Sequence, residues 1–363
     1  MKKTIIVIDK NVKLTPAQAK AHYTWTETLS NGKPFFCVPT RKVISEGSQF
    51  QHKKLCDGRT FTLGWTCGFS CQFCYVKTIL CRHAGIARIL KESGLAFQDV
   101  VVEKEDPLPV LTRQLVGKNG QRKFPDPKDR QVVFSSPMID VAANRKTALL
   151  TVEACRIILD QTAWTIRLLS KSAGLKLIAE GLSEYRERVI YGLSTGTLAD
   201  NLARAFELGA SSPSARVRTL RWLQDNGYRT FGMICPSLPQ EDYASFSSEL
   251  AEAIRADRCE HVWAEVLNVR GKSMERTCTS LRARGFEKEA VRVEQLQDDP
   301  AVWETNARQT FLAHARTIPP EKLRFLQYVG AGQREWWAAQ KPNGAILLGK
   351  TAATVRRAGR PRV

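Results

Sequence analysis

The sequence predicts an α/β protein built around a parallel sheet. From residue 131 to residue 267, short runs of β-branched and apolar residues alternate with longer stretches of helical periodicity. Strands that alternate with helices of this length pair in parallel through right-handed crossovers. Small polar residues follow almost every expected strand, at the edge where parallel sheets bind ligands. The 363 residues are enough for one large domain or two smaller ones.

The alternation predicts about six strand–helix units. The expected strands are 61–65, 131–135, 165–169, 189–194, 228–234 and 261–267. The expected helices are 145–161, 175–187, 214–225 and 241–256. Ser212 and Pro213 favour a helix start, and Asn226 with Gly227 favours a helix end.

Four regions are expected along the chain. They are an N-terminal extension at 1–55, the core at 56–275, a helical and strand segment at 276–340, and a basic, flexible tail at 341–363.

Several shorter segments are expected inside these regions. A strand lies at 5–8, because Asp9 ends the apolar run too early for a secretory leader. A helix or lid covers 76–90, and the proline-rich, charged run 104–130 is a loop. Near the C-terminus, a helix covers 300–315 and a strand covers 323–328.

The composition indicates a polyanionic partner and a reducing compartment. The formal net charge is +19 and the pI is near 9.7, which favours nucleic acid over the alternatives of an anionic membrane surface or solubility alone. The ten cysteines are scattered rather than arranged as a secreted disulfide framework. No apolar run approaches the ~20 residues that a membrane helix needs. We expect a cytoplasmic protein without a membrane partner.

Three cysteines lie on one short loop, in the order Cys67-x3-Cys71-x2-Cys74. Gly68 and Ser70 allow the backbone to fold back, so that the three sulfurs converge. Thiolates are preferred ligands of iron–sulfur clusters and of zinc, but a structural zinc site takes four protein ligands, usually as two pairs. The alternatives are buried reduced thiols, or a zinc site completed by one further residue: Cys56, Cys81 or His83.

This spacing, with the aromatic Phe73 before the third cysteine, resembles the signature of the radical SAM superfamily. The resemblance implies a [4Fe–4S] cluster on Cys67, Cys71 and Cys74, with S-adenosylmethionine bound at the open iron. It also implies a partial, open (β/α)6 barrel, radical hydrogen abstraction, and an external one-electron donor such as flavodoxin or ferredoxin.

The polar residues after the strands are the candidates for binding S-adenosylmethionine. Lys171 suits its carboxylate, because a lysine at the mouth of a barrel is costly unless paired. Ser194 and Thr195 suit the methionine and ribose ends. The remaining candidates are Phe73 near the adenine, its neighbour Tyr75, and Ser136 after the second strand. Capping of the following helices is the alternative for Ser and Thr, and also for Asp140.

Further motifs resemble the spore photoproduct lyase branch, the DNA repair photolyase-like group. They are 167–171, 189–194, 211–217, 227–228 and Cys235-Pro236, within a resemblance that covers roughly residues 60–270. By position, Lys171 and Ser194 match that family's cofactor contacts, and Arg216 matches a basic position.

One departure concerns hydrogen return. The lyases of this family carry a cysteine after the second strand, which returns a hydrogen atom to the product radical. Here residues 135–140 contain no cysteine. Cys235 at the end of the fifth strand is an alternative donor, and Tyr191 or Tyr75 is a candidate relay. The alternatives are a buried structural thiol and core tyrosines.

The tail ends in Gly359-Arg360-Pro361 with flanking arginines. This motif resembles an AT-hook, in which an extended basic segment enters the narrow minor groove of DNA. A disordered basic tail with a chance match is the alternative.

The leading hypothesis is a radical SAM enzyme that acts on nucleic acid, with DNA favoured, in repair, lyase or modification chemistry. A second hypothesis keeps the chemistry but acts on RNA, a peptide or a metabolite. A third, from another class, is a non-catalytic DNA-binding iron–sulfur protein.

Overall fold

The computed structural model describes residues 27–28, 33–80, 83–135, 137–268 and 272–349. Within them, one large sheet has the strand order β13-β12-β11-β10-β9-β8-β7-β4-β3. Every neighbouring pair is parallel except β3 with β4. The strands are β3 (Ile44–Ser45), β4 (Arg59–Phe61), β7 (Val132–Ser135), β8 (Thr165–Ser170), β9 (Val189–Ser194), β10 (Arg229–Ser237), β11 (Val262–Val266), β12 (Leu323–Tyr328) and β13 (Ala345–Leu348). The predicted α/β class with a large parallel sheet is confirmed.

The sheet extends further than the six predicted units. β12 pairs with β11, and β13 pairs with β12, so the C-terminal segment is part of the sheet. The segment 341–363, which was expected to be a flexible tail, therefore contains a strand of the sheet, β13, which ends at Leu348. The sheet is open, with β3 and β13 as its edges. Its curvature into a partial barrel stays a prediction.

The helices begin and end where the sequence carries capping residues. α5 (Arg145–Gln161) matches its predicted range, and Asn144 caps it by accepting from the backbone of Thr147 at 3.0 Å. The other expected helices are α6 (Leu175–Gly181) with the 3-10 turn η3 (Ser183–Arg188), α8 (Pro213–Asp225), α9 (Tyr243–Ala253) and α12 (Pro300–Thr317). The expected helix or lid at 76–90 is divided into α2 (Val76–Leu80) and α3 (Ala84–Ser93). Further helices are α7 (Asp200–Phe206), α10 (Ser273–Arg282), α11 (Glu287–Asp298) and α13 (Arg334–Ala339).

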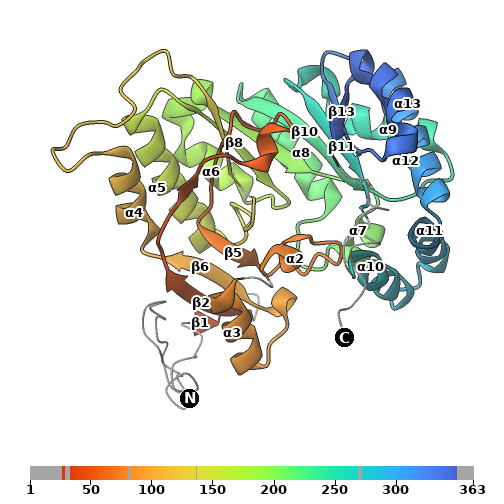
Figure 1. The fold of residues 1–363 in the computed structure, drawn as a ribbon, viewed down its shortest axis with the longest axis horizontal. Coiled ribbons are helices and arrows are strands. Elements are labelled where there is room, and N and C mark those ends of the chain that lie inside the picture. The colour runs from red at the N-terminus through yellow and green to blue at the C-terminus, as the bar shows by residue number, and fades with distance from the viewer. Residues whose placement is uncertain (1–26, 29–32, 81–82, 136, 269–271, 350–363) are drawn as a thin grey trace.

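A second, smaller sheet, which was not expected, combines strands of the N-terminal extension with strands on either side of the cysteine loop. Its order is β1-β2-β6-β5, and Figure 1 shows it with α3 below the large sheet. Its strands are β1 (Glu27–Thr28), β2 (Pro34–Pro39), β5 (Gly64–Cys67) and β6 (Val101–Glu105). The expected strand 61–65 is thus divided, because β4 pairs in the large sheet and β5 in the small one.

The expected loop at 104–130 contains a helix, α4 (Pro107–Leu115). Pro107 and Pro109 read as loop signals, but proline fits the first turn of a helix, where its missing N–H is not needed. Leu111 and Leu115 of this helix are fully buried. The prediction of a loop is therefore wrong for residues 107–115.

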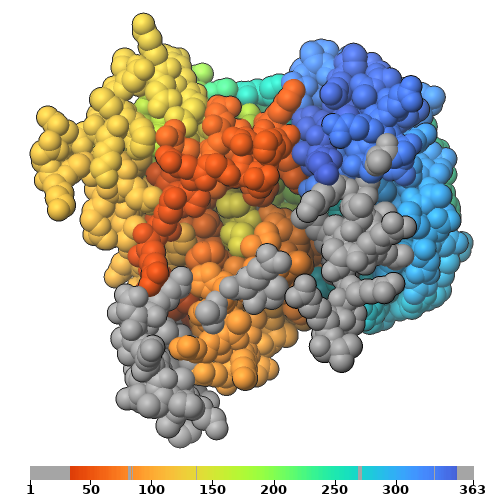
Figure 2. Space-filling model, in the orientation of Figure 1, coloured from red at the N-terminus to blue at the C-terminus, as the bar shows by residue number. Residues whose placement is uncertain are grey.

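Two apolar layers cover the two faces of the large sheet. One layer packs the sheet against the helices and contains Ile158, Leu220 and Phe311. The other contains Phe134, Phe231 and other strand residues, and the chain segment 49–56 covers it. In Figure 2 the red-to-orange N-terminal part of the chain spans the centre of the molecule.

The segment 49–56 is held on the sheet by its backbone carbonyls. The indole N–H of Trp263 donates to the carbonyl of Lys53 at 2.8 Å, and the guanidinium of Arg167 donates to that of Leu55 at 2.7 Å. These bonds satisfy buried donors from β11 and β8. Segment 49–56 therefore covers part of the face of the sheet opposite the helices.

One glycine of β9 is required by packing on this face. A Cβ on Gly192 would lie 2.2 Å from the ring of Phe231, its neighbour in β10. Such a distance is far below van der Waals contact, so the Phe231 ring occupies the space that a side chain would need.

Among the helices of the described ranges, none is long and apolar enough to cross a bilayer.

Candidate active site

The cysteine loop, residues 67–75, begins at the last residue of β5. Gly68 and Ser70 have φ values of +68° and +56°, so the predicted reversal of the backbone is confirmed. A Cβ on Gly68 would approach the Val101 side chain to 2.9 Å, which adds a steric reason for glycine.

Hydrogen bonds with α7, with Gly209 after it and with α10 fix one side of the cysteine loop. The N–H of Gln72 donates to the carbonyl of Phe206 at 2.9 Å, and the N–H of Gly209 donates to that of Phe69 at 2.7 Å. From α10, the guanidinium of Arg276 donates to the Gln72 carbonyl at 3.0 Å. The loop is thus attached to elements that follow it by more than a hundred residues.

Two further hydrogen bonds fix the other side. The Lys33 ammonium donates to the Ser70 hydroxyl at 3.0 Å, next to its ion pair with Asp99 at 3.1 Å. The hydroxyl of Tyr75 donates to the carbonyl of Pro137 at 2.6 Å, which joins the loop to the segment after β7. The predicted cofactor residue Tyr75 thus has a positioning contact.

The three thiols lie close enough to affect one another electrostatically. Burial raises the pKa of Cys67 to about 12, with Asp140 and Cys74 adding to the shift. Burial also raises the pKa of Cys71 and of Cys74, and for Cys71 the carboxylate of Glu207 adds to it. Thiolates here need a cation to compensate them, which an iron–sulfur cluster provides.

No three His, Cys, Asp or Glu side chains of the described residues are arranged to hold a single metal ion. A four-iron cluster places a different requirement on the loop, because its cysteine ligands bind separate iron atoms. The donor set of three thiols on one reversed loop fits that chemistry.

The residues considered for a zinc site have other positions. Cys56 belongs to segment 49–56 and is buried against sheet residues such as Phe134. The Nδ1 atom of His83 accepts from the backbone of Ile86 at 3.3 Å and caps α3. Cys81 lies outside the described residues.

Lys171 lies at the centre of a group of side chains that we call the strand-end cluster: Lys171, Ser194, Glu207 and Arg216. Its ammonium donates to the Ser194 hydroxyl at 3.0 Å, to Glu207 at 2.6 Å and to the carbonyl of Cys235 at 2.9 Å. An ammonium has three donors, and all three have partners here. Lys171 is paired as expected, but with Glu207 in the position that we predicted for a cofactor carboxylate.

Glu207 is the residue of this cluster that the sequence did not reveal. It follows α7, is 3% exposed, and forms ion pairs with both Lys171 and Arg216. Burial favours its neutral form, but the two cations outweigh burial and lower its pKa. Glu207 also forms an isolated backbone bridge with Cys71, so the cluster touches the cysteine loop.

Arg216 is 1% exposed and uses its guanidinium within the protein. Besides Glu207, it donates to the carbonyls of Ser211 and Ser194, each at 2.7 Å. These contacts give the buried Arg216 a positioning role. Its predicted role in cofactor binding stays a prediction. Thr195 is also buried, and its N–H donates to the carbonyl of Met233 at 2.8 Å.

Asp140 joins the segment after β7 to the end of β8. Its carboxylate accepts from the Ser170 hydroxyl at 2.6 Å, from the N–H of Lys171 at 2.7 Å and from the N–H of Ala142 at 2.9 Å. Burial raises the pKa of Asp140 despite these bonds. The bond to Ala142 lies within the segment before α5, which is capped by Asn144 and not by Asp140, while the other two bonds connect two strand ends.

Phe73 lies next to the strand-end cluster. The Lys171 ammonium is 5.2 Å from the centre of its ring, and the Phe206 ring is 5.7 Å away. This contact of an ammonium with a ring face is a cation–π interaction. Ser136, the other predicted residue after β7, lies outside the described residues.

Cys235 lies near the end of β10, on the face covered by segment 49–56. Burial raises its pKa to about 12, with a further contribution from Glu265. Glu265 pairs with Lys53 of the covering segment at 3.2 Å. Cys235 and this ion pair therefore lie close together, near the carboxyl ends of β10 and β11.

Tyr191 lies on the opposite face of the sheet from Ser194. Its ring is fully buried in the helix-side layer and meets the Tyr228 ring edge-on at 5.7 Å. Side chains three positions apart on a strand point to opposite faces. This placement separates Tyr191 from the cysteine loop and argues against its predicted catalytic role.

No family model matches the chain, but a curated protein is similar to part of its sequence. Uncharacterized protein ORF301 of Acidianus two-tailed virus is 33% identical over 102 residues, which is 26% of this chain. The match spans only 33% of that relative's length.

Solved structures of spore photoproduct lyase have a similar fold. Its complex with dinucleoside spore photoproduct has a TM-score of 0.50 at 12% identity, covering 73% of this chain and 68% of the lyase. A cysteine-to-serine mutant and a double mutant with bound AdoMet both give 0.49 at 12% identity, covering 76% of this chain and 72% of the lyase. At this identity the likeness concerns the fold: the chain folds like spore photoproduct lyase.

Proposed function

We propose that this chain is a radical SAM enzyme that acts on nucleic acid, with DNA as the favoured substrate. The observation that carries the proposal is the position of the cysteine loop. Three thiols lie on a reversed loop that contacts Glu207, beside the carboxyl ends of parallel strands. The likeness of the fold to spore photoproduct lyase supports the same reading.

A [4Fe–4S] cluster held by Cys67, Cys71 and Cys74 would, together with S-adenosylmethionine, supply a 5′-deoxyadenosyl radical for hydrogen abstraction. An external one-electron donor such as flavodoxin or ferredoxin would reduce it. The contribution of the protein is to hold the ligands in place. Arg276 and Tyr75 fix the cysteine loop from two sides, while Lys171, Glu207 and Arg216 fix the strand ends beneath it.

Within this proposal Cys235 returns a hydrogen atom to the substrate radical. A thiol donates a hydrogen atom only in its protonated form, and burial keeps Cys235 protonated at neutral pH. The S–H bond breaks as a C–H bond forms on the substrate, which leaves a thiyl radical. The external one-electron donor and a proton then restore the thiol.

Charge supports nucleic acid as the substrate. The net charge of +19 favours a polyanion, and phosphate contacts dominate the affinity of most nucleic-acid-binding proteins. The Gly359-Arg360-Pro361 motif, which lies outside the described residues, adds a candidate DNA contact. Because β13 pairs with β12, a truncation that tests the tail must leave the chain intact as far as Gly349.

The test is anaerobic reconstitution with iron and sulfide, reduction with dithionite, and measurement of 5′-deoxyadenosine with and without DNA. We expect 5′-deoxyadenosine to form and DNA to accelerate it. Its absence in both samples would reject the enzymatic proposal. A reconstituted cluster whose spectrum does not change when S-adenosylmethionine is added would instead favour a non-catalytic iron–sulfur protein.

A further inference from the structure

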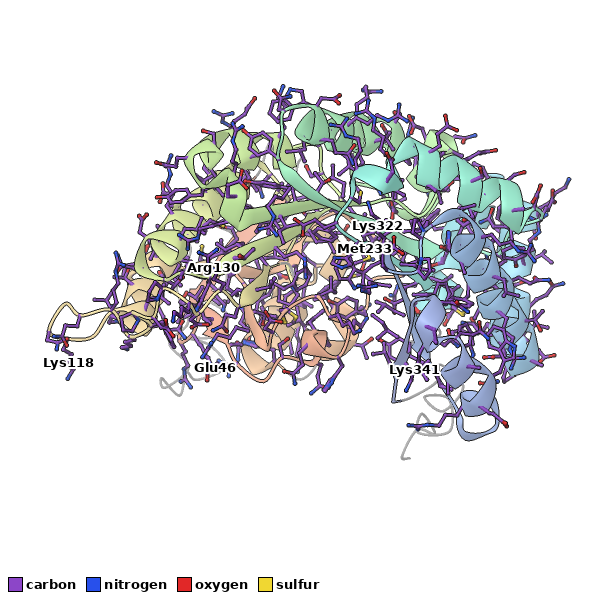
Figure 3. The ribbon with its side chains drawn as sticks, turned by 90° about the horizontal axis from the view of Figure 1, so that it is seen from above. Glu46, Lys118, Arg130, Met233, Lys322 and Lys341 are labelled. Atoms are coloured by element: carbon purple, nitrogen blue, oxygen red, sulfur yellow. The ribbon has the colours of Figure 1, made fainter. Side chains whose placement is uncertain are left out.

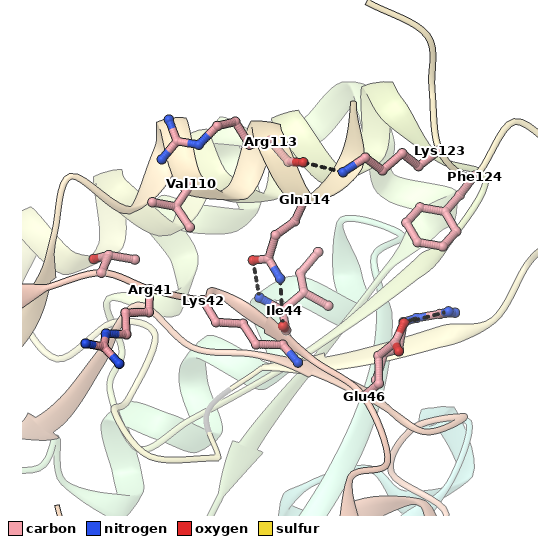
Figure 4. A pocket seen from close by; sticks show the side chains of 11 residues that line it. Arg41, Lys42, Ile44, Glu46, Val110, Arg113, Gln114, Lys123 and Phe124 are labelled. Atoms are coloured by element: carbon pink, nitrogen blue, oxygen red, sulfur yellow. Dashed lines mark hydrogen bonds and ion pairs between the residues drawn. The ribbon is translucent and has the colours of Figure 1, made fainter. Parts of the chain in front are cut away.

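A basic pocket lies where the chain passes from the small sheet to the large one, between β3 and α4. Its volume is about 430 Å³. Figure 4 shows Arg41 and Lys42 below it, Arg113 above it, and Lys123 beside Phe124.

Positive charge dominates the lining of this pocket. Five lining side chains are cationic: Arg41, Lys42, Arg59, Arg113 and Lys123. The one acidic lining residue, Glu46, pairs with Arg59 at 3.0 Å. Lys42, Arg113 and Lys123 are all exposed. Three exposed cations, Lys42, Arg113 and Lys123, therefore line this space in addition to Arg41 and to Arg59, which is paired with Glu46.

The floor of the pocket is fixed by Gln114 of α4. Its side-chain oxygen accepts from the N–H groups of Val43 and Ile44 at 2.7 and 3.0 Å, and its side-chain nitrogen donates to the Ile44 carbonyl at 2.9 Å. These bonds join α4 to the edge strand β3. These bonds hold the backbone of α4 at Arg113, the preceding residue, against the start of β3, next to Lys42.

Two further contacts hold cations at the far end. The Lys123 ammonium donates to the Arg113 carbonyl at 2.6 Å, in the last turn of α4. The Arg59 guanidinium lies 4.9 Å from the Phe124 ring and 5.0 Å from the Trp164 ring. Cation–π contacts of this kind order a guanidinium while leaving its charge in place.

The positive surface continues beyond the pocket along the loop that follows α4. In this loop, residues 116–130, Lys118 lies at the far end of a projection from the body of the molecule, whereas Arg130 lies back against the body (Figure 3). This loop carries five basic residues and two acidic ones. The basic residues are Lys118, Arg122, Lys123, Lys128 and Arg130.

We propose that this pocket binds the phosphodiester backbone of a nucleic acid strand. A small phosphate ligand would need only the pocket, whereas the cations of the loop extend the positive surface in one direction, as a backbone requires. The proposal deepens the proposed function and rests on it for the identity of the polyanion.

The test uses the full-length chain and a double variant, Lys42→Glu with Arg113→Glu. Binding of a fluorescein-labelled oligonucleotide, single-stranded and duplex, is followed by anisotropy over a range of salt concentrations. We expect affinity to fall about tenfold at moderate salt, and the salt slope for duplex to fall by about two, since each phosphate contact contributes about 0.9.

The matched control is Arg218→Glu with Lys288→Glu, which makes the same charge change at exposed positions of α8 and α11. Equal losses in both double variants would overturn the proposal, since net charge alone would then explain binding. Displacement of the oligonucleotide by low concentrations of ADP would also overturn it, by identifying a nucleotide pocket. Lys42→Gln with Arg113→Gln repeats the test without reversing charge, should the first variant not fold.

The outcomes separate this site from the radical chemistry. If 5′-deoxyadenosine forms normally but the pocket variant binds like the control, the pocket assignment fails alone. If no 5′-deoxyadenosine forms but the pocket variant loses binding, the pocket stands and the proposed enzyme activity fails.

Discussion

The ammonium of Lys171 lies 2.6 Å from the carboxylate of Glu207, and both side chains are largely buried. Arg216 contacts the same carboxylate from the other side. One acid thus compensates two cations at the point where the ends of β8 and β9 meet the cysteine loop. The shape of this part of the molecule depends on that carboxylate.

Glu207→Gln removes the charge but keeps the size of the side chain. Lys171 and Arg216 would then lose their compensating charge, and breaking a buried ion pair from one side costs about 3–5 kcal/mol. We expect the free energy of unfolding in urea to fall by about this amount. Glu294→Gln, which breaks an exposed pair with Arg282, is the control and should change it little. A similar small effect of both variants would show that the Glu207 pair does not stabilise the fold.

Cys71→Ala removes the middle thiol of the loop. If Cys71 is a cluster ligand, the reconstituted variant should lose most of its bound iron and its brown colour, because one iron loses its thiolate. Iron and sulfide per chain, together with the visible spectrum, provide the measurement. Cys155→Ala, a thiol buried in α5, is the control and should load normally. Full loading of the Cys71 variant would contradict the ligand assignment.

Cys235→Ala tests the role of this thiol in hydrogen return. We expect 5′-deoxyadenosine formation to continue while the correctly restored nucleic acid product is lost, since the substrate radical would have no donor. Mass spectrometry of digested DNA after turnover measures the product, and chromatography of the reaction mixture measures 5′-deoxyadenosine. Cys259→Ala removes a buried thiol of the helix-side layer and should leave the product unchanged. An unchanged product from the Cys235 variant would exclude it as the donor.

Stability should depend on pH through His314. This residue is fully buried, its Nδ1 lies 2.7 Å from the Ser247 hydroxyl, and burial lowers its pKa to about 4. The unfolded chain takes up the proton near pH 6.5, so the free energy of unfolding should fall as the pH drops from about 6.5 to about 4. At 1.36 kcal/mol per pKa unit, the total loss from His314 is roughly 3 kcal/mol.

Urea unfolding of the wild type and of His314→Gln across this pH range measures the effect. In His314→Gln, the free energy of unfolding should depend less on pH, because the His314 contribution is lost. In His52→Gln, at an exposed position, that contribution should be kept. Equal slopes for the wild type and the His314 variant would rule out this source of acid sensitivity.

Gly192→Ala should destabilise the sheet by overpacking. The added Cβ would lie 2.2 Å from the Phe231 ring, so the ring or the strand must move, at a typical cost of about 1–3 kcal/mol. Thermal unfolding measures the change. Gly332→Ala, where no atom lies within 4 Å of the added Cβ, is the control and should unfold near the wild-type temperature.

Much of the fold could be predicted because its signals are local. The periodicity of residues 145–161 and their capping by Asn144 define α5, and the run 323–328 defines β12. β13 was missed because four residues beside a basic tail carry little pattern. The helix α4 was missed because its prolines, which fit a first turn, also mark loops.

The residues of the candidate site likewise divide into those with a local signal in the sequence and those without one. The spacing of the three cysteines is visible along the chain, and so is the polar character of Lys171 and Ser194 after their strands. Glu207 carries no such signal, because its role depends on contacts with two cations that are distant in the sequence. Lys171 precedes Glu207 by 36 residues, and Arg216 follows it by nine. Tyr191 was misplaced because a polar atom on a strand does not by itself reveal which face it occupies.

The attachments of the cysteine loop bear on how the protein would acquire its metal. In small metal-dependent domains the binding energy must also fold the chain, so the empty protein is a coil. Here Arg276, Tyr75 and Lys33 shape the loop through contacts of the polypeptide itself. The protein would thus bind iron at a loop that is already folded. The binding energy of the cluster would then contribute to the affinity of the site rather than to folding of the chain.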